Sequence, residues 1–358
     1  MKAWFLVGPN QFQLDDIAEP ELKEGYVVAE VLTAQPSVTE TIMVACEGDG
    51  FGIADRVKAG ERFRLPGHEL CARVIKTNPG SKFKVGDRVA SQAKIRCEKC
   101  DACINGGLCE NEELLGVTIE GIFAERVALP ERGLIRVPDA LTDSEAANIQ
   151  PLADCVAAVD SVNLKLGSTV VVYGAGCLGM NTMQVARVSG AGKVIVVDIK
   201  QENLDLALTL GATHVINGLK EDPVAKIMEI TNGVGAEVVF DAAGGDPKKG
   251  LAGTVALVNA SKSVAYGGEL LILPFYGSSV EFPIGVFRMT SKKLVFPIFA
   301  TRKHLEHGAA LIEAGLVQIA PQVSYQLEGI DKVPEVFEIT GSKHTTRSIA
   351  PAQVIINK

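Results

Sequence analysis

The sequence predicts an α/β protein with two domains, one a partly open β-barrel and the other a doubly wound parallel sheet covered by helices. The chain has 358 residues, which is too long for one ordinary hydrophobic core and suits two domains of common size. Short β-like runs separated by turns fill its first part, and strands alternate with helices from about Asp154 onward. Such alternation implies right-handed crossovers and therefore a parallel sheet.

The first part holds short runs of apolar and β-branched residues. Strands are predicted at residues 27–32, 71–76 and 123–129, and Gly86-Asp-Arg-Val-Ala90 fits a turn that leads into another strand. Few helical periods of any length occur here. We therefore expect the partly open barrel to occupy residues 1–154.

The alternating part predicts a helix after each strand. Strands are expected at 169–173, 193–197, 213–216, 237–240 and 269–273, and helices at 178–188, 203–210, about 224–230 and about 250–260. These elements place the parallel-sheet domain at residues 155–295. Residues 296–358 return to mixed character, with an amphipathic helix at 304–314 and a strand at 352–356.

Composition excludes several classes of protein. A hydrophobic fraction of 47% without low-complexity runs indicates a globular chain, and a formal net charge of −8 argues against a nucleic-acid surface. No apolar run is long enough to span a bilayer, and the N-terminus is too soon interrupted to be a signal peptide. We expect a cytoplasmic protein with neither nucleic acid nor membrane as a partner.

A glycine-rich turn between a strand and a helix predicts a dinucleotide site. In Gly174-Ala-Gly176-Cys177-Leu178-Gly179, the first glycine would allow the tight turn and the second would let the backbone approach a pyrophosphate. Gly179 would let the helix lie close to the strand. The N–H groups of the first helical turn, at Cys177 and Leu178, would face the phosphates.

The next predicted strand ends at Asp198, at the distance where a carboxylate accepts hydrogen bonds from the adenosine ribose hydroxyls. A carboxylate there would repel a 2′-phosphate, so NAD is favoured over NADP. The alternative is a glycine turn in an α/β domain that binds no nucleotide.

Four cysteines gather in a lobe at about residues 95–112, namely Cys97, Cys100, Cys103 and Cys109. Their spacing suits one structural zinc ion per chain. A bacterial ferredoxin run would place its fourth cysteine sooner and follow it with proline, and a reducing compartment disfavours disulfides. The remaining cysteines are scattered and are expected to be small buried residues: Cys46, Cys71, Cys155 and Cys177.

These motifs together resemble the zinc-dependent medium-chain dehydrogenases, the superfamily of alcohol, sorbitol and threonine dehydrogenases. The matching segments cover nearly the whole chain: Gly67-His68-Glu69, Gly86-Asp87-Arg88-Val89, the cysteine lobe, Gly121-Ile-Phe-Ala-Glu125, and Gly174–Gly179 with Asp198. The resemblance implies a GroES-like catalytic barrel, built from the N-terminal part and the C-terminal tail, around a central Rossmann domain.

The resemblance also implies a catalytic metal site. His68 keeps the histidine ligand position, Asp154 takes the third ligand position, and Glu69 is expected to be an exchange ligand or to lie behind the ligands. Thr39 takes the position of the hydroxyl that relays the proton.

The sequence departs from the family at the thiolate ligand. That position is Ser37, which is either a weak ligand or a packing residue, and Glu40 is a possible extra ligand. The family's other optional ligand falls on Gln150, and its relay histidine falls on Ile42. The remaining set would bind zinc or another divalent ion through nitrogen and oxygen. The alternative is that His68 and Asp154 are hydrogen-bond partners and no metal binds.

The implied function is NAD(H)-dependent transfer of hydride between nicotinamide and a secondary alcohol or ketone, as a polyol, cyclitol, sugar or amino-alcohol substrate. The alternatives are a metal-independent medium-chain reductase and a non-catalytic NAD-binding protein. We expect a homodimer or homotetramer.

Basic residues offer a further hint about substrate. Arg56, Lys58, Arg62 and Arg64 precede His68, and the same interpretation extends to Arg302, His304, Lys343, His344 and Arg347. Such residues either meet an anionic or highly hydroxylated substrate or simply face water.

Overall fold

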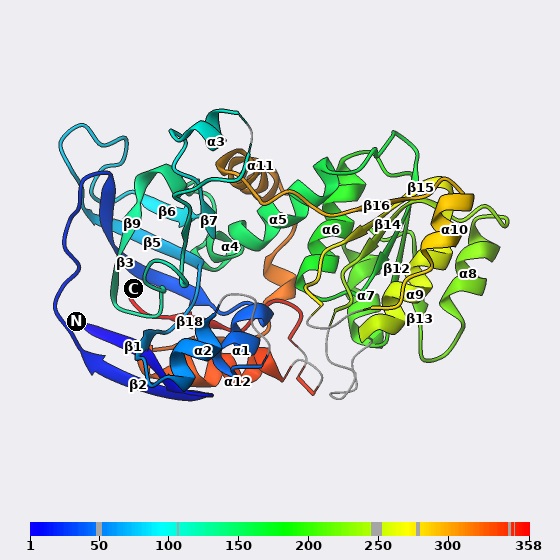
Figure 1. The fold of residues 1–358 in the computed structure, drawn as a ribbon. Coiled ribbons are helices and arrows are strands. Elements are labelled where there is room, and N and C mark those ends of the chain that lie inside the picture. Colours follow the sequence, from blue (N-terminus) through cyan, green and yellow to red (C-terminus); the bar gives the residue numbers. More distant parts are fainter. Residues whose placement is uncertain (48–51, 106, 245–252, 277–279, 343–344, 347) are drawn as a thin grey trace. The chain divides into compact units, whose positions relative to one another are not determined.

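The computed structural model describes residues 1–47, 52–105, 107–244, 253–276, 280–342, 345–346 and 348–358 (Figure 1). It divides into two compact units. The first comprises Met1–Gln150, Ala300–Glu313 and Gln322–Lys358, and the second comprises Pro151–Phe299 and Ala314–Pro321. The first boundary therefore falls at residue 150 rather than the expected 154, and residues 314–321 belong with the second unit.

The first unit is built mainly from antiparallel strands. They are β1 (Lys2–Gly8), β2 (Gln11–Asp16), β3 (Tyr26–Gln35), β4 (Phe63–Arg64), β5 (Glu69–Lys76), β6 (Arg88–Ser91), β7 (Lys94–Ile95), β8 (Glu113–Leu114), β9 (Arg126–Pro130), β10 (Leu134–Arg136), β17 (Gln326–Glu328) and β18 (Gln353–Ile355). The main sheet runs β10-β6-β5-β3-β18-β17, with β9 also paired to β3. Two smaller sheets, β2-β1-β4 and β7-β8, complete the partly open barrel.

Short helices accompany these strands. They are α1 (Val38–Val44), α2 (Ile53–Lys58), α3 (Asp101–Ile104), α4 (Asp143–Ala147), α11 (Arg302–Glu313) and α12 (Val333–Gly341), with the 3-10 turns η1 (Glu131–Gly133) and η4 (Ile330–Lys332). Helix α5 (Ile149–Asp160) and turn η3 (Ala320–Gln322) cross the boundaries between the units.

The core of the first unit joins segments that are far apart in the sequence. The ring of Phe337 in α12 lies 4.9 Å from that of Phe123 and 5.4 Å from that of Phe12, measured between ring centroids. Strand β18 pairs with β3, with Val354 opposite Ala34. The C-terminal segment therefore completes the sheet that the N-terminal segment begins.

The second unit is a six-stranded parallel sheet. Its strands are β11 (Thr169–Tyr173), β12 (Lys193–Asp198), β13 (His214–Asn217), β14 (Ala236–Asp241), β15 (Val264–Ile272) and β16 (Lys293–Val295), in the order β13-β12-β11-β14-β15-β16. This is the Rossmann order, with the chain reversing direction across the sheet between β13 and β14. The predicted fold class, a Rossmann sheet plus a GroES-like barrel, is confirmed.

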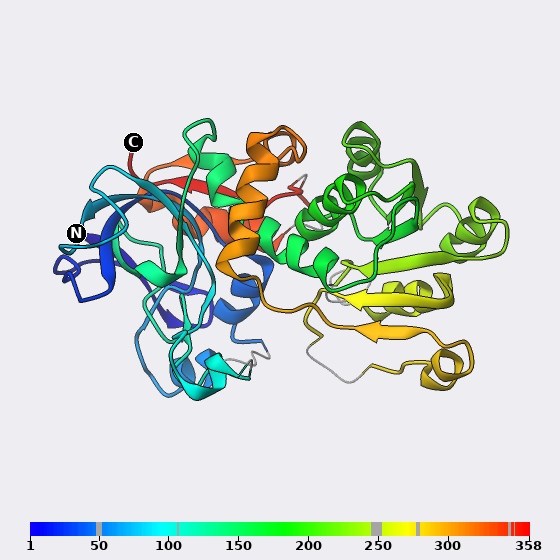
Figure 2. The ribbon, with the colours of Figure 1, turned by 90° about the horizontal axis from the view of Figure 1, so that it is seen from above.

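Helices pack against this sheet (Figure 2). They are α6 (Cys177–Val188), α7 (Gln201–Thr209), α8 (Pro223–Ile230), α9 (Gly253–Ser263) and α10 (Ile284–Met289). The sequence of β11 requires this covering, because residues 170–173 are all buried, as in a parallel strand with helices on both faces. Among the described residues, no helix is both long enough and apolar enough to span a membrane.

The sequence does not predict some of the short helices and strands. Helices α1, α2 and α12 and strand β16 were not predicted, since each is short and its polarity pattern covers too few turns to be distinctive. The helix predicted at about 250–260 begins at Gly253 in the structure, and residues 250–252 lie outside the described residues. Lys343, His344 and Arg347 also lie outside them.

Gly121 permits a close backbone contact in the first unit. A Cβ atom at this position would lie 1.9 Å from the carbonyl oxygen of Leu65 and 3.1 Å from the Cα of Pro66. The amide of Leu65 in turn donates to the carbonyl of Trp4. The segment that leads into His68 is therefore held against residues 121–123 by a contact that only glycine allows.

We expect Gly121→Ala to lower the free energy of unfolding of the first unit by about 2–3 kcal/mol, because the clash is with backbone rather than with a movable side chain. Trp4 is the single tryptophan of the chain and is buried in this unit, so its fluorescence during urea unfolding reports the change. Gly285→Ala is the control, since a Cβ there meets nothing within 4 Å. An unchanged urea midpoint in Gly121→Ala would contradict the close contact.

Candidate catalytic, cofactor and metal sites

His68 lies beside a buried carboxylate. Its Nδ1 atom is 2.6 Å from Oε1 of Glu40, and the Glu40 side chain is only 1% exposed. The approach is close, but Oε1 accepts no hydrogen bond of regular geometry. A carboxylate buried to this degree is stabilised by a positive partner, such as a protonated imidazole or a cation bound beside the two groups.

Helix α1 positions Glu40 by its capping arrangement. Ser37 is the N-cap: its Oγ accepts from the amide of Glu40 at 3.3 Å, and Oε2 of Glu40 accepts from the amide of Ser37 at 2.5 Å. This reciprocal pair is a capping box, which fixes the carboxylate at the third helical position. Ser37, which stands where the family has a thiolate, therefore serves the helix terminus in this structure.

Thr39 occupies the second position of the same helix and is half-buried. Among the described residues its hydroxyl has no hydrogen-bond partner, in contrast to that of Thr41, which donates to Val38. A hydroxyl in this condition is available to a ligand. Its role in proton relay stays a prediction.

Glu69 points into a buried polar network. Gln35 and Glu69 are opposite each other on strands β3 and β5, and Nε2 of Gln35 donates to Oε2 of Glu69 at 2.5 Å. The Oε1 atom of Gln35 accepts from Gln353 at 2.8 Å and from Asn148 at 3.2 Å. Glu69 is thus held by the side-chain amide of Gln35, and its exchange-ligand role stays a prediction.

The first unit supplies two groups suited to a catalytic cation. Within its described residues, no third imidazole, thiolate or carboxylate joins His68 and Glu40 in a cluster of mutual ligand distance. Asp154 is half-buried in α5 and belongs to the second unit. The orphaned oxygen of Glu40 beside an imidazole fits a hard divalent ion, with nitrogen and oxygen ligands rather than sulfur.

The cysteine lobe has the geometry of a closed metal site. The ligand atoms of Cys97, Cys100, Cys103 and Cys109 all lie within 4.8 Å of one another. The Sγ atoms of Cys97 and Cys103 are 3.9 Å apart, close to the edge of about 3.8 Å expected for a tetrahedron of sulfurs around zinc. The residues therefore fit the ion.

Backbone amides in the cysteine lobe donate toward the sulfur atoms and so favour their thiolate form. The amide of Cys100 approaches Sγ of Cys97 at 3.4 Å, that of Cys103 approaches Cys100 at 3.4 Å, and that of Cys97 approaches Cys109 at 3.3 Å. Hydrogen bonds from the amides of Lys99 and Cys100 lower the pKa of the Cys97 thiol to about 6. The other four cysteines are buried, as expected.

The glycine turn of the second unit has the conformation that its motif predicts. Gly174 has φ +93°, and a Cβ at Gly179 would lie 1.8 Å from the carbonyl oxygen of Gly174. At Gly176, the N-cap of α6, a Cβ would meet nothing within 4 Å. The turn is therefore tight at its two ends and open in the middle, which fits a pyrophosphate at the start of α6, where Cys177 and Leu178 are the first residues.

Asp198 closes this turn from the end of β12. Its Oδ2 accepts from the amide of Ala175 at 2.6 Å, and its Oδ1 accepts from that of Lys200 at 2.8 Å. The carboxylate is half-buried and lies beside the glycine turn. It holds the turn in shape, and its role in binding the ribose stays a prediction.

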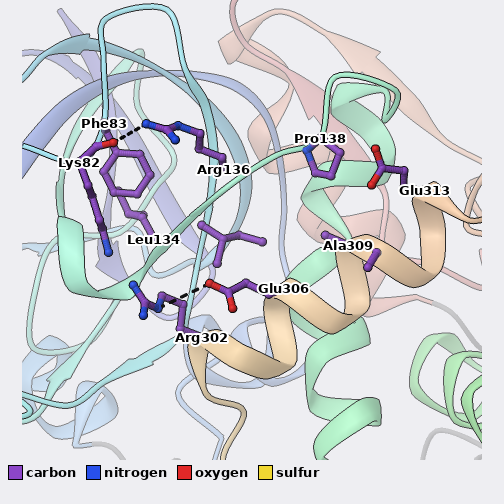
Figure 3. A pocket seen from close by; sticks show the side chains of 11 residues that line it. Lys82, Phe83, Leu134, Arg136, Pro138, Arg302, Glu306, Ala309 and Glu313 are labelled. Carbon is purple, nitrogen blue, oxygen red and sulfur yellow. Dashed lines mark hydrogen bonds and ion pairs between the residues drawn. The ribbon is translucent and has the colours of Figure 1, made fainter.

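A pocket in the first unit contains Arg302, one of the basic residues noted above, but none of the predicted catalytic, cofactor or metal residues. It has a volume of about 380 Å³ and lies between β10 and α11 (Figure 3). Charges of both signs line it. Arg136 donates to the carbonyl of Lys82 and pairs with Asp87, and Arg302 lies 3.7 Å from Glu306.

Glu40 lies closer to the centre of the candidate site than the sequence indicates. It named Glu40 only as a possible extra ligand, whereas the structure makes it the partner of His68. The spacing Ser37-Val-Thr-Glu40 is a capping-box pattern and is visible in the sequence. The pattern would have predicted the helix and the orientation of the carboxylate.

Two domain families match the chain. Residues 38–139 match the alcohol dehydrogenase GroES-like domain, and residues 177–314 match the zinc-binding dehydrogenase family. These segments lie in the barrel and the Rossmann parts of the chain respectively, apart from the C-terminal end of the second match, which includes α11.

Curated relatives align over most of the chain. An L-threonine 3-dehydrogenase of Pyrococcus furiosus is 31% identical over 301 residues, which is 81% of this chain and 83% of the relative. A sorbitol dehydrogenase of Bacillus subtilis is 31% identical over 269 residues, 73% of this chain and 74% of the relative.

Solved structures share the fold at lower identity. A zinc-binding dehydrogenase from Sinorhizobium meliloti 1021 bound to NADP superposes with a TM-score of 0.83 and 23% identity, covering 100% of this chain and 99% of that chain. An alcohol dehydrogenase from Escherichia coli CFT073 complexed with NADH gives a TM-score of 0.84 and 20% identity, with the same coverage. The domain matches and the relatives above 30% identity show that this chain belongs to the zinc-dependent medium-chain dehydrogenase superfamily.

Proposed function

We propose that the chain is an NAD-dependent dehydrogenase that interconverts a secondary alcohol and its ketone, with a polyol, cyclitol, sugar or amino-alcohol as substrate. The observation that carries the proposal is the placement of His68, whose Nδ1 lies 2.6 Å from the buried Glu40. A protein that only bound nucleotide would need the glycine turn but not a buried charged pair in the other unit. The relatedness of the chain to a threonine dehydrogenase and a sorbitol dehydrogenase supports the substrate class.

His68 would hold a divalent cation, with Glu40 as a second group and Glu69 behind them; Asp154, the third predicted ligand, belongs to the second unit. When bound, such an ion acts as a Lewis acid on the substrate oxygen. Glu40 would compensate the positive charge of the cation beside His68, and the hydroxyl of Thr39 would relay the alcohol proton, accepting it from the alcohol while passing its own proton to solvent. The glycine turn at Gly174, Gly176 and Gly179 would hold the pyrophosphate of the dinucleotide, whose nicotinamide ring would be the hydride donor or acceptor.

The cysteine lobe would hold a second, structural ion. Helix α3 covers only four residues and buries none of its side chains, so the lobe has little core of its own. Metal binding therefore supplies folding free energy there rather than chemistry. Unpaired thiols in such a cluster also suit a reducing, cytoplasmic setting.

NAD rather than NADP is the proposed cofactor, because the carboxylate of Asp198 ends β12 beside the glycine turn. A 2′-phosphate would place a dianion next to that carboxylate and would repel it. Similar folds are known with either cofactor bound, so the ribose-binding residue of this chain is the deciding feature.

We also propose that two copies associate through the edge of the Rossmann sheet. Strand β16 is an outer strand of that sheet and offers unpaired backbone groups on one side. Large exposed apolar residues lie on and after α10 and after β16: Ile284, Met289, Phe296, Ile298 and Phe299. Exposed apolar residues next to a sheet edge are typical of a protein–protein interface.

His68→Ala is expected to lower kcat/KM for alcohol oxidation by about a hundredfold to ten-thousandfold, while NAD binding is retained. His307→Ala is the matched control, because His307 is exposed on α11. Metal analysis by mass spectrometry should find about two ions per chain in the wild type and about one in His68→Ala. Near-normal turnover in His68→Ala would overturn the proposed mechanism.

Asp198→Asn is expected to lower kcat/KM with NAD by about tenfold and to raise it with NADP, since the change removes the negative charge but keeps an acceptor for Ala175. Asp205→Asn, an exposed site on α7, makes the same change of charge elsewhere. The ratio of the two kcat/KM values is the measurement. A wild type that prefers NADP would refute this assignment.

The association predicts a particle mass of about twice 37.9 kDa, or a higher even multiple, in light scattering. A monomeric mass at micromolar concentration would contradict it.

A further inference from the structure

A second pocket of the first unit is lined by arginines. It has a volume of about 290 Å³, and its walls are Arg56, Arg62, Phe63 and Arg64 on one side and residues 117–120 on the other. We refer to it as the Arg64 pocket. Strand β4, which carries Phe63 and Arg64, pairs with β1 and so places these side chains at the edge of a small sheet.

Arg64 is a buried cation without adequate partners. The residue is 8% exposed, and its Nε and Nη2 atoms are buried with no hydrogen-bond acceptor. The nearest carboxylate oxygen, Oε2 of Glu120, lies 3.6 Å from Nη1, which is too far for a hydrogen bond. Burial lowers the pKa of the Arg64 guanidinium, and Glu120 opposes this only in part.

The other two arginines are already compensated. Arg56 pairs with Glu61, and Arg62 pairs with Asp15. Each guanidinium also lies over an aromatic ring, Arg56 at 4.4 Å from the centroid of Phe63 and Arg62 at 3.7 Å from that of Phe5. These contacts hold both side chains beside Arg64, whose own guanidinium lies 5.7 Å from the centroid of Phe5.

We infer that the Arg64 pocket binds an oxyanion, a phosphate or carboxylate group, through the guanidinium of Arg64. A planar guanidinium with unmet N–H groups matches such a group bidentately. The side chain of Glu120 is 64% exposed, so it can turn into solvent when the anion enters. The ligand then supplies the acceptors that the protein does not.

The pocket adjoins the segment that carries His68. A Cβ at Gly116 would lie 2.5 Å from the amide nitrogen of Gly67, so the chain just before the pocket wall at 117–120 touches the residue before His68. The anion could therefore be the charged group of a substrate or a free anion bound beside it. The binding site itself does not rest on the proposed function; only the first of these two sources does.

The pocket of Figure 3 provides the matched control. It also contains arginines, but Arg302 pairs with Glu306 and Arg136 with Asp87, and both arginines are largely exposed. Among the described residues lining that pocket, no buried guanidinium nitrogen lacks an acceptor. A general attraction of anions to arginine would act there too, whereas a built site would act only at Arg64.

Titration calorimetry with inorganic phosphate tests the inference on the full chain. We expect the wild type and Arg302→Met to bind phosphate alike, and Arg64→Met to bind it about tenfold or more weakly, the loss expected for a charge-assisted hydrogen bond. Without phosphate, Arg64→Met should unfold at the same temperature as the wild type or higher, because it removes a buried charge that its neighbours compensate only in part. Should it not fold, Arg64→Lys keeps the charge and loses the bidentate geometry, and weaker binding is again expected.

Two results would overturn the inference. One is an absence of phosphate binding to the folded wild type at millimolar concentration. The other is equal binding by the wild type and the Arg64 variants, which would make the interaction a property of the general surface.

Kinetics then separates the two sources of the anion. If the anion belongs to the substrate, Arg64→Met raises KM for galactitol 1-phosphate and not for galactitol, and phosphate competes with the former alone. If the anion is free, phosphate alters turnover of both substrates equally in the wild type and much less in Arg64→Met. Failure to turn over any alcohol would count against the proposed function, and calorimetry would still decide on the site.

Discussion

Contacts between backbone segments, made possible by glycine, hold both functional segments of this chain in place. In the first unit Gly121 meets the carbonyl of Leu65 and Gly116 meets Gly67, which fixes the segment that leads into His68. In the second unit Gly179 meets the carbonyl of Gly174, which fixes the start of α6 against β11. Since no side chain separates these segments, they have little freedom to shift, and the geometry of each site follows from them.

Given that scaffold, the chemistry near His68 depends on where negative charge is buried. The family's thiolate is replaced by Ser37, but the capping box that Ser37 forms brings the carboxylate of Glu40 to His68. One anion has thus been lost and another anion lies next to the imidazole. Under the proposed function, a hard ligand would take the place of a soft one, which would change the preferred cation more than the overall charge of the site.

Much of this could be predicted from the sequence, and the limits are physical. The glycine turn and the cysteine spacing encode backbone geometry within a few residues, so Gly174 and the four thiols lie as expected. Contacts between residues far apart in the sequence are harder to predict. The pairs Glu40–His68 and Gln35–Glu69, for example, depend on the pairing and register of β3 and β5. In the sequence, Arg64 is indistinguishable from a solvated charge. Its burial comes from the pairing of β4 with β1, which only the structure shows.

The position of β18 in the main sheet has a consequence for how the chain acquires its structure. During synthesis β3 emerges early, but its partner at Gln353–Ile355 follows only after all of residues 151–321. The Rossmann sheet is built from nearly contiguous sequence and can form while the ribosome is still working. Until β18 is synthesised, part of one edge of β3 in the barrel stays unpaired. Pairing between strands so far apart in the sequence is also slow. Assistance by chaperones would therefore matter most for the half of the molecule that contains His68.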